Sequence, residues 1–233
     1  MTSVNERLQQ VKQRIHRANS SIGAGVQSVT LLAVSKTQPA DAVRDAVAAG
    51  QRAFGENYVQ EALDKMAALA DLRPQLEWHL IGPLQSNKTR VVAEAFDWVH
   101  SVDRLKIAQR LNEQRPAWLP PLNVCLQVNI SGEASKSGYM PEEVPAAAHA
   151  VAALPRLRLR GLMAIPEPAG DVEAQRAPHR ALRALFERLR GEGLDLDTLS
   201  MGMSADMEAA VAEGATIVRV GTAIFGERPS KAM

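Results

Sequence analysis

The sequence predicts an α/β protein, a (β/α)8 barrel of the TIM type with a leading helix at its N-terminus. The prediction rests on eight short apolar, strand-like runs, on helical stretches between them, and on a length of 233 residues. Strands that alternate with helices of this kind form βαβ units and a parallel sheet. Eight such units in one chain favour a closed barrel, and an open, doubly wound sheet is the alternative.

The elements follow one another in a regular order. The leading helix is expected at 3–18, where apolar residues recur every three or four positions. A linker with Gly23 and Gly25 follows, and then a strand at 29–35 whose apolar run is typical of burial on both faces. The other strands are expected at 52–55, 77–81, 97–100, 122–130, 157–163, 198–201 and 216–220. The helices between the strands are expected at 40–49, 57–71, 85–95, 103–114, 141–153, 171–190 and 205–213.

The composition argues against several classes of protein. The net charge is +1, from 27 Lys and Arg against 26 Asp and Glu, so a polyanion-binding surface is not expected. With Cys125 as the single cysteine and no histidine at metal-ligand spacing, we expect neither a disulfide nor a metal site. There is no apolar secretory signal and no run of about 20 apolar residues. We therefore expect a cytoplasmic protein that binds no nucleic acid and no membrane.

Polar residues follow most of the predicted strands. In a barrel, functional groups gather at the C-terminal ends of the strands. The residues at or near these ends include Ser35, Lys36, Glu56, Asn57, His79, His100, Ser101, Asn129, Ser200, Arg219, Gly221 and Thr222. We expect them to converge on a pocket at one rim of the barrel.

Lys36 is the most informative of these residues, because the chain has seven lysines against twenty arginines. Lys12, Lys65 and Lys106 fall on amphipathic helices and are interpreted as solvated. Lys36 instead continues the apolar alternation of the first strand, on the face expected to line the barrel interior. Burial disfavours an ammonium, and a neutral amine is what condensation with an aldehyde requires. The alternative is a lysine that reaches water just past the strand.

A phosphate site is expected where the seventh and eighth strands end. Ser204 precedes a helical stretch as a good N-cap, and Gly221 and Thr222 precede a segment, 223–225, that can form one more helical turn. Helix starts bind phosphate through backbone N–H groups, and barrels often place phosphate between these two loops. The alternative is that Ser204 only caps a helix and Gly221 only makes a turn.

Arg219 is the third candidate, on the opposite face of the last strand from Val218 and Val220. An arginine in a barrel interior must find acceptors, because it keeps its charge. The acceptor is either an acidic residue of another strand or an atom of a ligand. An aldehyde for Lys36, a phosphate, and an acceptor for Arg219 together describe pyridoxal 5′-phosphate.

Seven segments carry a resemblance to a known family. They are LLAVSKTQP (31–39), FGENYVQEALDK (54–65), WHLIGPLQSNK (78–88), VHSVDR (99–104), VNISGEASKSGY (128–139), GLMAI (161–165) and LSMGMSADMEAAVAEGATIVRVGTAIFGER (199–228). Over nearly its whole length, the sequence resembles the pyridoxal phosphate homeostasis proteins, single-domain relatives of the alanine racemase barrel. The resemblance implies a barrel of fold type III with pyridoxal phosphate as its cofactor.

The resemblance assigns Lys36 and Arg219 to the two ends of the cofactor's ring system. Lys36 matches the lysine that forms a Schiff base with the cofactor, and Arg219 matches the arginine that faces the pyridine nitrogen. Such a cation disfavours a protonated pyridinium and so weakens the cofactor as an electron sink. That suits holding the cofactor or a simple proton transfer, and it does not suit transamination.

The remaining assignments concern the phosphate and the pocket wall. Ser204, Gly221 and Thr222 match the phosphate-binding positions of the family, and Asn57 lies in the second-strand motif and is expected to line the cofactor pocket. His79 lies in a signature segment without an assigned role. A core histidine that is satisfied by hydrogen bonds is an equally good interpretation.

The resemblance favours a carrier over an enzyme, because racemases of this type need a second base. That base is a tyrosine from the C-terminal β domain of a partner subunit. We expect one barrel domain over 1–233, residues 227–233 being too few for such a domain, and neither Tyr58 nor Tyr139 at an equivalent place. The expected protein is a monomer without assigned catalytic residues that stores, shields or delivers pyridoxal phosphate and contacts apo-enzymes transiently. A weak amino-acid racemase and a barrel enzyme that binds a sugar phosphate are the alternatives.

Four further features of the sequence lie outside the predicted cofactor site. Lys88 and Lys136 lie in loop-like segments, and one of them is a candidate for a secondary cofactor site or transfer surface. Cys125 is interpreted as a small buried hydrophobe. The arginines in 156–160 are interpreted as a solvated or ion-paired strand face.

Overall fold

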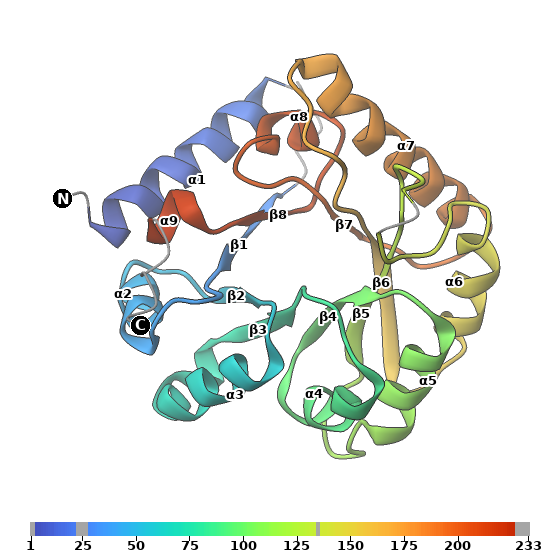
Figure 1. Ribbon diagram of the computed structural model, residues 1–233, viewed down its shortest axis with the longest axis horizontal. Coiled ribbons are helices and arrows are strands. Elements are labelled where there is room, and N and C mark those ends of the chain that lie inside the picture. Colours follow the sequence, from blue (N-terminus) through green and yellow to red (C-terminus); the bar gives the residue numbers. More distant parts are fainter. Residues whose placement is uncertain (1–2, 22–27, 134–135, 227–233) are drawn as a thin grey trace.

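Eight parallel strands close into a barrel in the order of the sequence (Figure 1). The computed structural model describes residues 3–21, 28–133 and 136–226, so Gly23 and Gly25 of the expected linker lie outside it, as do residues 227–233. The strands are β1 Thr30–Val34, β2 Ala53–Glu56, β3 Glu77–Leu80, β4 Trp98–Val102, β5 Leu122–Gln127, β6 Leu157–Met163, β7 Thr198–Ser200 and β8 Ile217–Val220. Because β1 pairs with β8, the ring is closed, and the predicted (β/α)8 barrel is confirmed.

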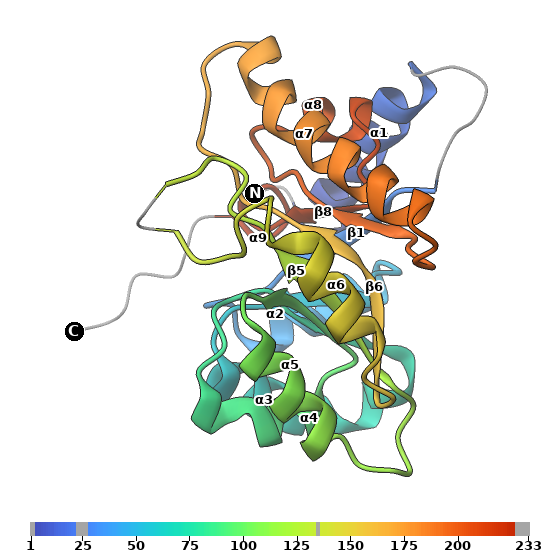
Figure 2. The ribbon, with the colours of Figure 1, turned by 90° about the vertical axis from the view of Figure 1, so that its right-hand side faces the viewer.

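Helices surround the barrel, and α1 lies beside α8 and α9 (Figures 1 and 2). The α-helices are α1 Val4–Ser20, α2 Ala40–Ala48, α3 Val59–Ala68, α4 Thr89–Ala95, α5 Leu105–Gln114, α6 Val144–Ala152, α7 Val172–Gly191, α8 Met207–Ala212 and α9 Thr222–Phe225. Two 3-10 helices, η1 Ala70–Gln75 and η2 Ser86–Lys88, flank α3 and α4. The short helical turn expected at 223–225 is present as α9.

Several elements are shorter than predicted, and two of them show a clear reason. The strand expected at 122–130 ends at Gln127, because Val128 forms only an isolated bridge with Tyr139 as the chain turns back. The helix expected at 57–71 ends at Ala68 and continues as the 3-10 helix η1, which contains a proline. Proline lacks the N–H that an α-helix needs in its interior.

The leading helix packs onto the end of the chain. A capping box formed by Ser3 and Glu6 starts α1, and its buried face includes Leu8. Arg14 pairs with Glu208 at 2.8 Å, and Arg7 Nε donates to the Ile224 carbonyl at 2.6 Å. The helix therefore stabilises α8 and α9, which follow the seventh and eighth strands.

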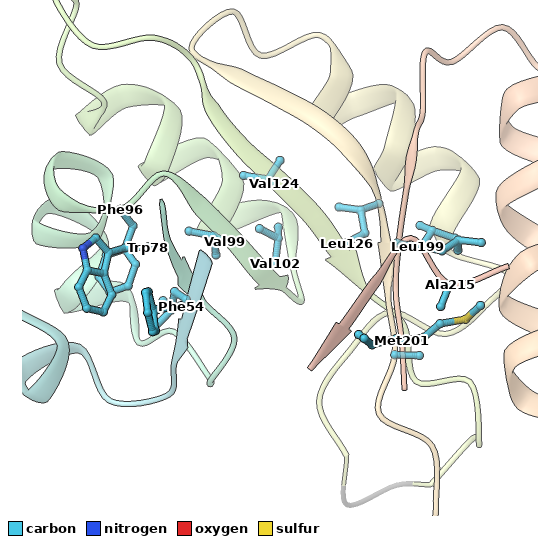
Figure 3. Packing of buried hydrophobic residues seen from close by; sticks show 14 of the residues in the cluster. Phe54, Trp78, Phe96, Val99, Val102, Val124, Leu126, Leu199, Met201 and Ala215 are labelled. Atoms are coloured by element: carbon cyan, nitrogen blue, oxygen red, sulfur yellow. The ribbon is translucent and has the colours of Figure 1, made fainter. Parts of the chain in front are cut away.

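The hydrophobic residues form layers on both sides of the barrel wall. Between barrel and helices, Phe54, Trp78 and Phe96 pack together on one side (Figure 3), and the rings of Phe54 and Trp78 lie 5.7 Å apart. Inside the barrel, Leu32 belongs to a separate cluster on the alternate face of its strand. Cys125 is fully buried and burial raises its pKa to about 12, which confirms its interpretation as a small hydrophobe.

Shortening the buried face of α1 should destabilise the fold. Leu8→Ala is expected to lower the free energy of unfolding by about 2–5 kcal/mol, because a fully buried leucine leaves a cavity. Gln9→Ala, on the exposed side of the same helix, should change it by less than about 0.5 kcal/mol. Urea unfolding of both variants checks this, and equal midpoints would show that α1 does not stabilise the barrel.

Candidate functional site

The C-terminal ends of the strands bring the predicted residues to one mouth of the barrel. Lys36 lies in a turn two residues beyond β1, and Asn57 directly follows β2. Ser204 lies four residues beyond β7, and Gly221 and Thr222 directly follow β8. Parallel strands in a closed barrel all end at the same mouth, so these residues share it.

The ends of β7, β8 and β1 adjoin closely. The Arg219 backbone N–H donates to the Gly202 carbonyl at 3.0 Å, which extends the pairing of β7 with β8. A Cβ atom at Gly221 would lie 3.1 Å from the Val34 carbonyl oxygen, so the loop after β8 passes tightly against the end of β1. Lys36 therefore lies at the same corner as the loops predicted to bind phosphate.

Ser204 is not the N-cap of α8, contrary to the prediction. Asp206 occupies the N-cap position, and its Oδ1 accepts a hydrogen bond from the Met203 N–H at 2.7 Å. This bond closes a turn over 203–206, so the helix starts at Met207. Ser204 lies within the turn, where its carbonyl accepts from Arg14 at 3.2 Å.

Arg219 lies inside the barrel with 4% of its surface exposed. Its guanidinium donates to the Ser200 carbonyl at 2.6 Å, to Ser200 Oγ at 2.9 Å and to the Ala164 carbonyl at 2.9 Å. Burial lowers the pKa of Arg219 to about 10, so it is a cation at neutral pH. Within the described ranges its hydrogen bonds go to neutral acceptors and it forms no ion pair, which disfavours the acidic-partner alternative.

Lys65 is buried, contrary to its interpretation as a solvated helix residue. Only 5% of Lys65 is exposed, and Nζ lies 2.7 Å from Glu56 Oε1 and 2.6 Å from Glu61 Oε1. Nζ also donates to the Ser35 carbonyl at 2.5 Å. Together with Ala62, Lys65 forms the buried face of α3, which covers the ends of β1 and β2.

These buried charges hold the turn that carries Lys36. Ser35 Oγ donates to Glu56 Oε1 at 2.6 Å, and the Thr37 N–H donates to Glu61 Oε1 at 2.5 Å. Thr37 has a φ of +63°, which is uncommon for a residue other than glycine. Ser35 and Thr37, the two neighbours of Lys36, are thus held by hydrogen bonds to Glu56 and Glu61. These bonds limit the directions in which the Lys36 side chain can leave the backbone.

Asn57 lines a cavity at the same mouth. The cavity has a volume of about 220 Å³, and its lining includes Gly82, Asn129 and Lys136. Asn57 Oδ1 is buried and has no hydrogen-bond partner in the described part of the chain. A Cβ atom at Gly82 would lie 2.3 Å from the Asn57 carbonyl oxygen, so glycine is required for the two loops to meet.

His79 is a core histidine, and of its two ring nitrogens only Nδ1 has a hydrogen-bond partner in the described part of the chain. It is 1% exposed, its Nδ1 lies 2.9 Å from His100 Nε2, and its ring stacks on Trp98. Lys136 is ion-paired with Glu133, and Lys88 is exposed at the end of η2. Lys136 lines the cavity of Asn57 at the mouth that contains Lys36, whereas Lys88 is not part of the lining of that cavity.

Four residues support the site: Glu61, which the sequence does not single out, and Glu56, Ser200 and His100, which the sequence places at this mouth without a role. Glu56 and Glu61 fix the Lys36 turn, and Ser200 and His100 lie behind Arg219. Glu56 offered a signal, because it ends a strand that is otherwise buried and a buried carboxylate needs a partner. The contacts around Arg219 offered none, because they join strands far apart in the sequence.

The described residues contain neither a metal-binding cluster nor a membrane-spanning helix. Within 3–21, 28–133 and 136–226 there is no group of three or more His, Cys, Asp or Glu side chains arranged to hold a metal ion. Among the same residues, no helix combines the length and the apolar character that crossing a membrane requires.

The site lies in a closed barrel, with a lysine just beyond the first strand and a buried arginine in the last strand. The sequence pattern of the alanine racemase N-terminal domain matches residues 7–229. The chain is 64% identical over 228 residues to the pyridoxal phosphate homeostasis protein of Pseudomonas aeruginosa, covering 98% of this chain and 97% of that protein. It is 56% identical to the protein of that name from Escherichia coli K12, with 98% of each covered. The chain belongs to the pyridoxal phosphate homeostasis protein family.

Solved structures agree with this assignment. PipY of Synechococcus elongatus, solved without pyridoxal phosphate, is 42% identical with a TM-score of 0.86, over 96% of this chain and 100% of that one. PipY solved with pyridoxal phosphate bound is 41% identical, with a TM-score of 0.83. Alanine racemase from Corynebacterium glutamicum shares the fold at 19% identity and a TM-score of 0.68, with 62% of its own chain covered.

Removing the buried ammonium should destabilise the protein in a pH-dependent way. Lys65→Met is expected to cost about 3–5 kcal/mol at neutral pH, because it leaves buried carboxylates without their cation. Burial already raises the pKa of Glu56, which Lys65 opposes. In the variant that pKa should rise further, so the loss grows as pH rises and shrinks once Glu56 is protonated.

Urea unfolding at several pH values measures this effect. Lys106→Met, on an exposed position of α5, is the matched control and should change stability by less than about 0.5 kcal/mol at every pH. Equal stability of the two variants would contradict the role assigned to Lys65.

Proposed function

We propose that this chain binds pyridoxal phosphate covalently at Lys36 and holds it for storage, shielding or delivery, without substantial turnover. The main support is structural: hydrogen bonds fix the turn that contains Lys36, and this turn lies beside the loops after β7 and β8. The PipY relative, solved with pyridoxal phosphate bound, supports the same ligand.

The residues at the mouth fit the functional groups of this cofactor. When bound, pyridoxal phosphate supplies an aldehyde, and condensation with the Lys36 amine forms a C=N bond and releases water. Lys36 must be neutral to attack, because only the free amine is a nucleophile. Asn57 adds a buried side-chain oxygen without a partner in the described chain, which suits a donor on the ligand.

The phosphate is assigned to the loops after β7 and β8. Ser204 and Thr222 offer hydroxyl groups, and the backbone around Gly221 offers N–H groups at the start of α9. Since Gly202 has a φ of +90°, the loop after β7 takes a conformation that glycine adopts without strain. Arg14 ties this loop to α1 through the Ser204 carbonyl, so the cradle is held in place before the ligand arrives.

Arg219 is assigned to the pyridine nitrogen of the cofactor. Three fixed acceptors hold its guanidinium, and it keeps its charge at neutral pH. A cation at this place disfavours protonation of the ring nitrogen and so limits the electron-withdrawing power of the cofactor. That property suits a carrier better than an enzyme for difficult carbanion chemistry.

The environments of the two tyrosines support the carrier over the racemase. Tyr58 is 56% exposed, at the N-cap of α3. Burial raises the pKa of Tyr139 to about 12, which disfavours the phenolate that a base requires. The relatives carry the name of homeostasis proteins, which also favours the carrier over the racemase. We extend the proposal to a monomeric, cytoplasmic barrel domain over 1–233 that meets apo-enzymes transiently.

Covalent binding at Lys36 predicts a specific modified residue. After incubation with pyridoxal phosphate and reduction with borohydride, peptide mass mapping should find the pyridoxyl group on Lys36. Lys36→Ala should lose the absorbance of the bound cofactor, while Lys106→Ala, on an exposed helix, should keep it. A wild-type protein that takes up no cofactor, or one modified mainly elsewhere, would refute the assignment. Turnover of D- or L-amino acids that depends on Lys36 would favour the racemase.

The phosphate assignment predicts a selective loss of affinity. The double variant Ser204→Ala/Thr222→Val should bind pyridoxal phosphate about tenfold more weakly, because hydrogen bonds to a charged group are lost. Its affinity for pyridoxal, which lacks the phosphate, should stay within about twofold of the wild type. A parallel loss for both ligands would contradict the assignment of these residues to the phosphate.

A further inference from the structure

A line of hydrogen bonds runs from Arg219 through the interior of the barrel. Arg219 contacts Ser200 Oγ at 2.9 Å, and Ser200 Oγ lies 2.8 Å from His100 Nδ1. His100 Nε2 lies 2.9 Å from His79 Nδ1. The four side chains come from β8, β7, β4 and β3, and each has at most 4% of its surface exposed.

The directions of the bonds in this line are set at its two ends, by Arg219, which has only donors, and by the Glu77 carboxylate, which has only acceptors and lies 3.6 Å from His79 Nε2. A guanidinium has only donors, so Ser200 Oγ accepts from Arg219 and its own hydrogen is available to His100 Nδ1. A neutral His100 that accepts at Nδ1 carries its hydrogen on Nε2 and donates it to His79 Nδ1. His79 then carries its hydrogen on Nε2. All donors therefore point away from Arg219.

The line ends at the opposite mouth of the barrel. His79 Nε2 faces Glu77 Oε2 at 3.6 Å, and Glu77 is the first residue of β3, with 61% of its side chain exposed. Glu77 lines a cavity of about 550 Å³ together with Lys12, His16 and Arg52. A cation at the ligand mouth is thus connected by hydrogen bonds through neutral groups to His79, whose Nε2 lies near a carboxylate at the other mouth without a hydrogen bond to it.

Burial favours the neutral form of both rings. Burial lowers the pKa of His79, although Glu77 and Asp97 oppose the shift. Burial, then His79 and Arg219, lower the pKa of His100 well below its ordinary value. The ring of His79 also stacks on Trp98, with centroids 5.2 Å apart and an angle of 9° between the planes, so its orientation is fixed.

We propose that Ser200, His100 and His79 are positioning residues that orient Arg219 for the ligand. By accepting one arm of the guanidinium, the line directs the remaining N–H groups toward the ring acceptor of the cofactor. Because hydrogen bonds in a chain polarise one another, a ligand that binds Arg219 also changes the bond between His100 and His79. The expected effect on ligand binding rests on the proposed function. The tautomers expected for His79 and His100 do not depend on it.

Nitrogen NMR of the ligand-free protein tests the line by itself. With ¹⁵N-labelled histidine, both His79 and His100 should appear as neutral rings that carry hydrogen on Nε2. The signals are assigned with His79→Gln and His100→Gln. A hydrogen on Nδ1 of either ring, or a charged ring at neutral pH, would overturn the proposal whether or not the protein binds pyridoxal phosphate.

A matched pair of variants tests the effect on the ligand. Ser200→Thr keeps the hydroxyl, whereas Ser200→Val removes it at nearly the same side-chain size. Ser200→Val should bind pyridoxal phosphate about tenfold more weakly than Ser200→Thr. Adding the ligand should shift the His79 nitrogen signals in Ser200→Thr and leave them unchanged in Ser200→Val, a response that a merely structural serine does not predict.

Three outcomes decide between the possible explanations. If both variants bind equally and His79 responds in both, the positioning role is wrong. If the extra methyl group of Ser200→Thr prevents folding, Ser200→Ala is compared with the wild type, with the same difference expected. If the wild type binds no pyridoxal phosphate, the proposed function fails, and the tautomers still show whether the line exists.

Discussion

The pairing of β1 with β8 is the constraint on which the site depends. It closes the barrel and sets Leu32 opposite Arg219, although the two residues lie near opposite ends of the sequence. The same closure brings the turn of Lys36 against the loop at Gly221. The proposed attachment point and the proposed phosphate cradle are therefore neighbours only because the first and last strands are hydrogen-bonded to each other.

Two buried cations give this mouth its rigidity. Lys65 binds Glu56, Glu61 and a carbonyl of the Lys36 turn, and Arg219 binds acceptors on the ends of β6 and β7. A buried charge is stable only where fixed acceptors compensate for the lost water. Both cations therefore lock the backbone around them, and a site that is ordered beforehand binds its ligand at a lower cost in conformational entropy.

The sequence predicted the architecture well because hydrophobic periodicity and strand ends are local signals. It placed eight strands and the turn of α9 in nearly their observed ranges. It failed for Lys65, since periodicity alone does not show that Glu56 and the Ser35 carbonyl lie beneath that helix. It also indicates Ser204 as a helix cap, whereas the Met203 N–H donates to Asp206 Oδ1 and the helix begins after Asp206. The line behind Arg219 depends on barrel register, which no local pattern encodes.

A crystal structure of the chain grown with pyridoxal phosphate tests the central claim most directly. We predict continuous density from Lys36 Nζ to the cofactor, with the phosphate between the loops at Ser204 and Gly221 and the ring nitrogen facing Arg219. Density for the cofactor at another lysine, or a phosphate bound away from these two loops, would contradict it.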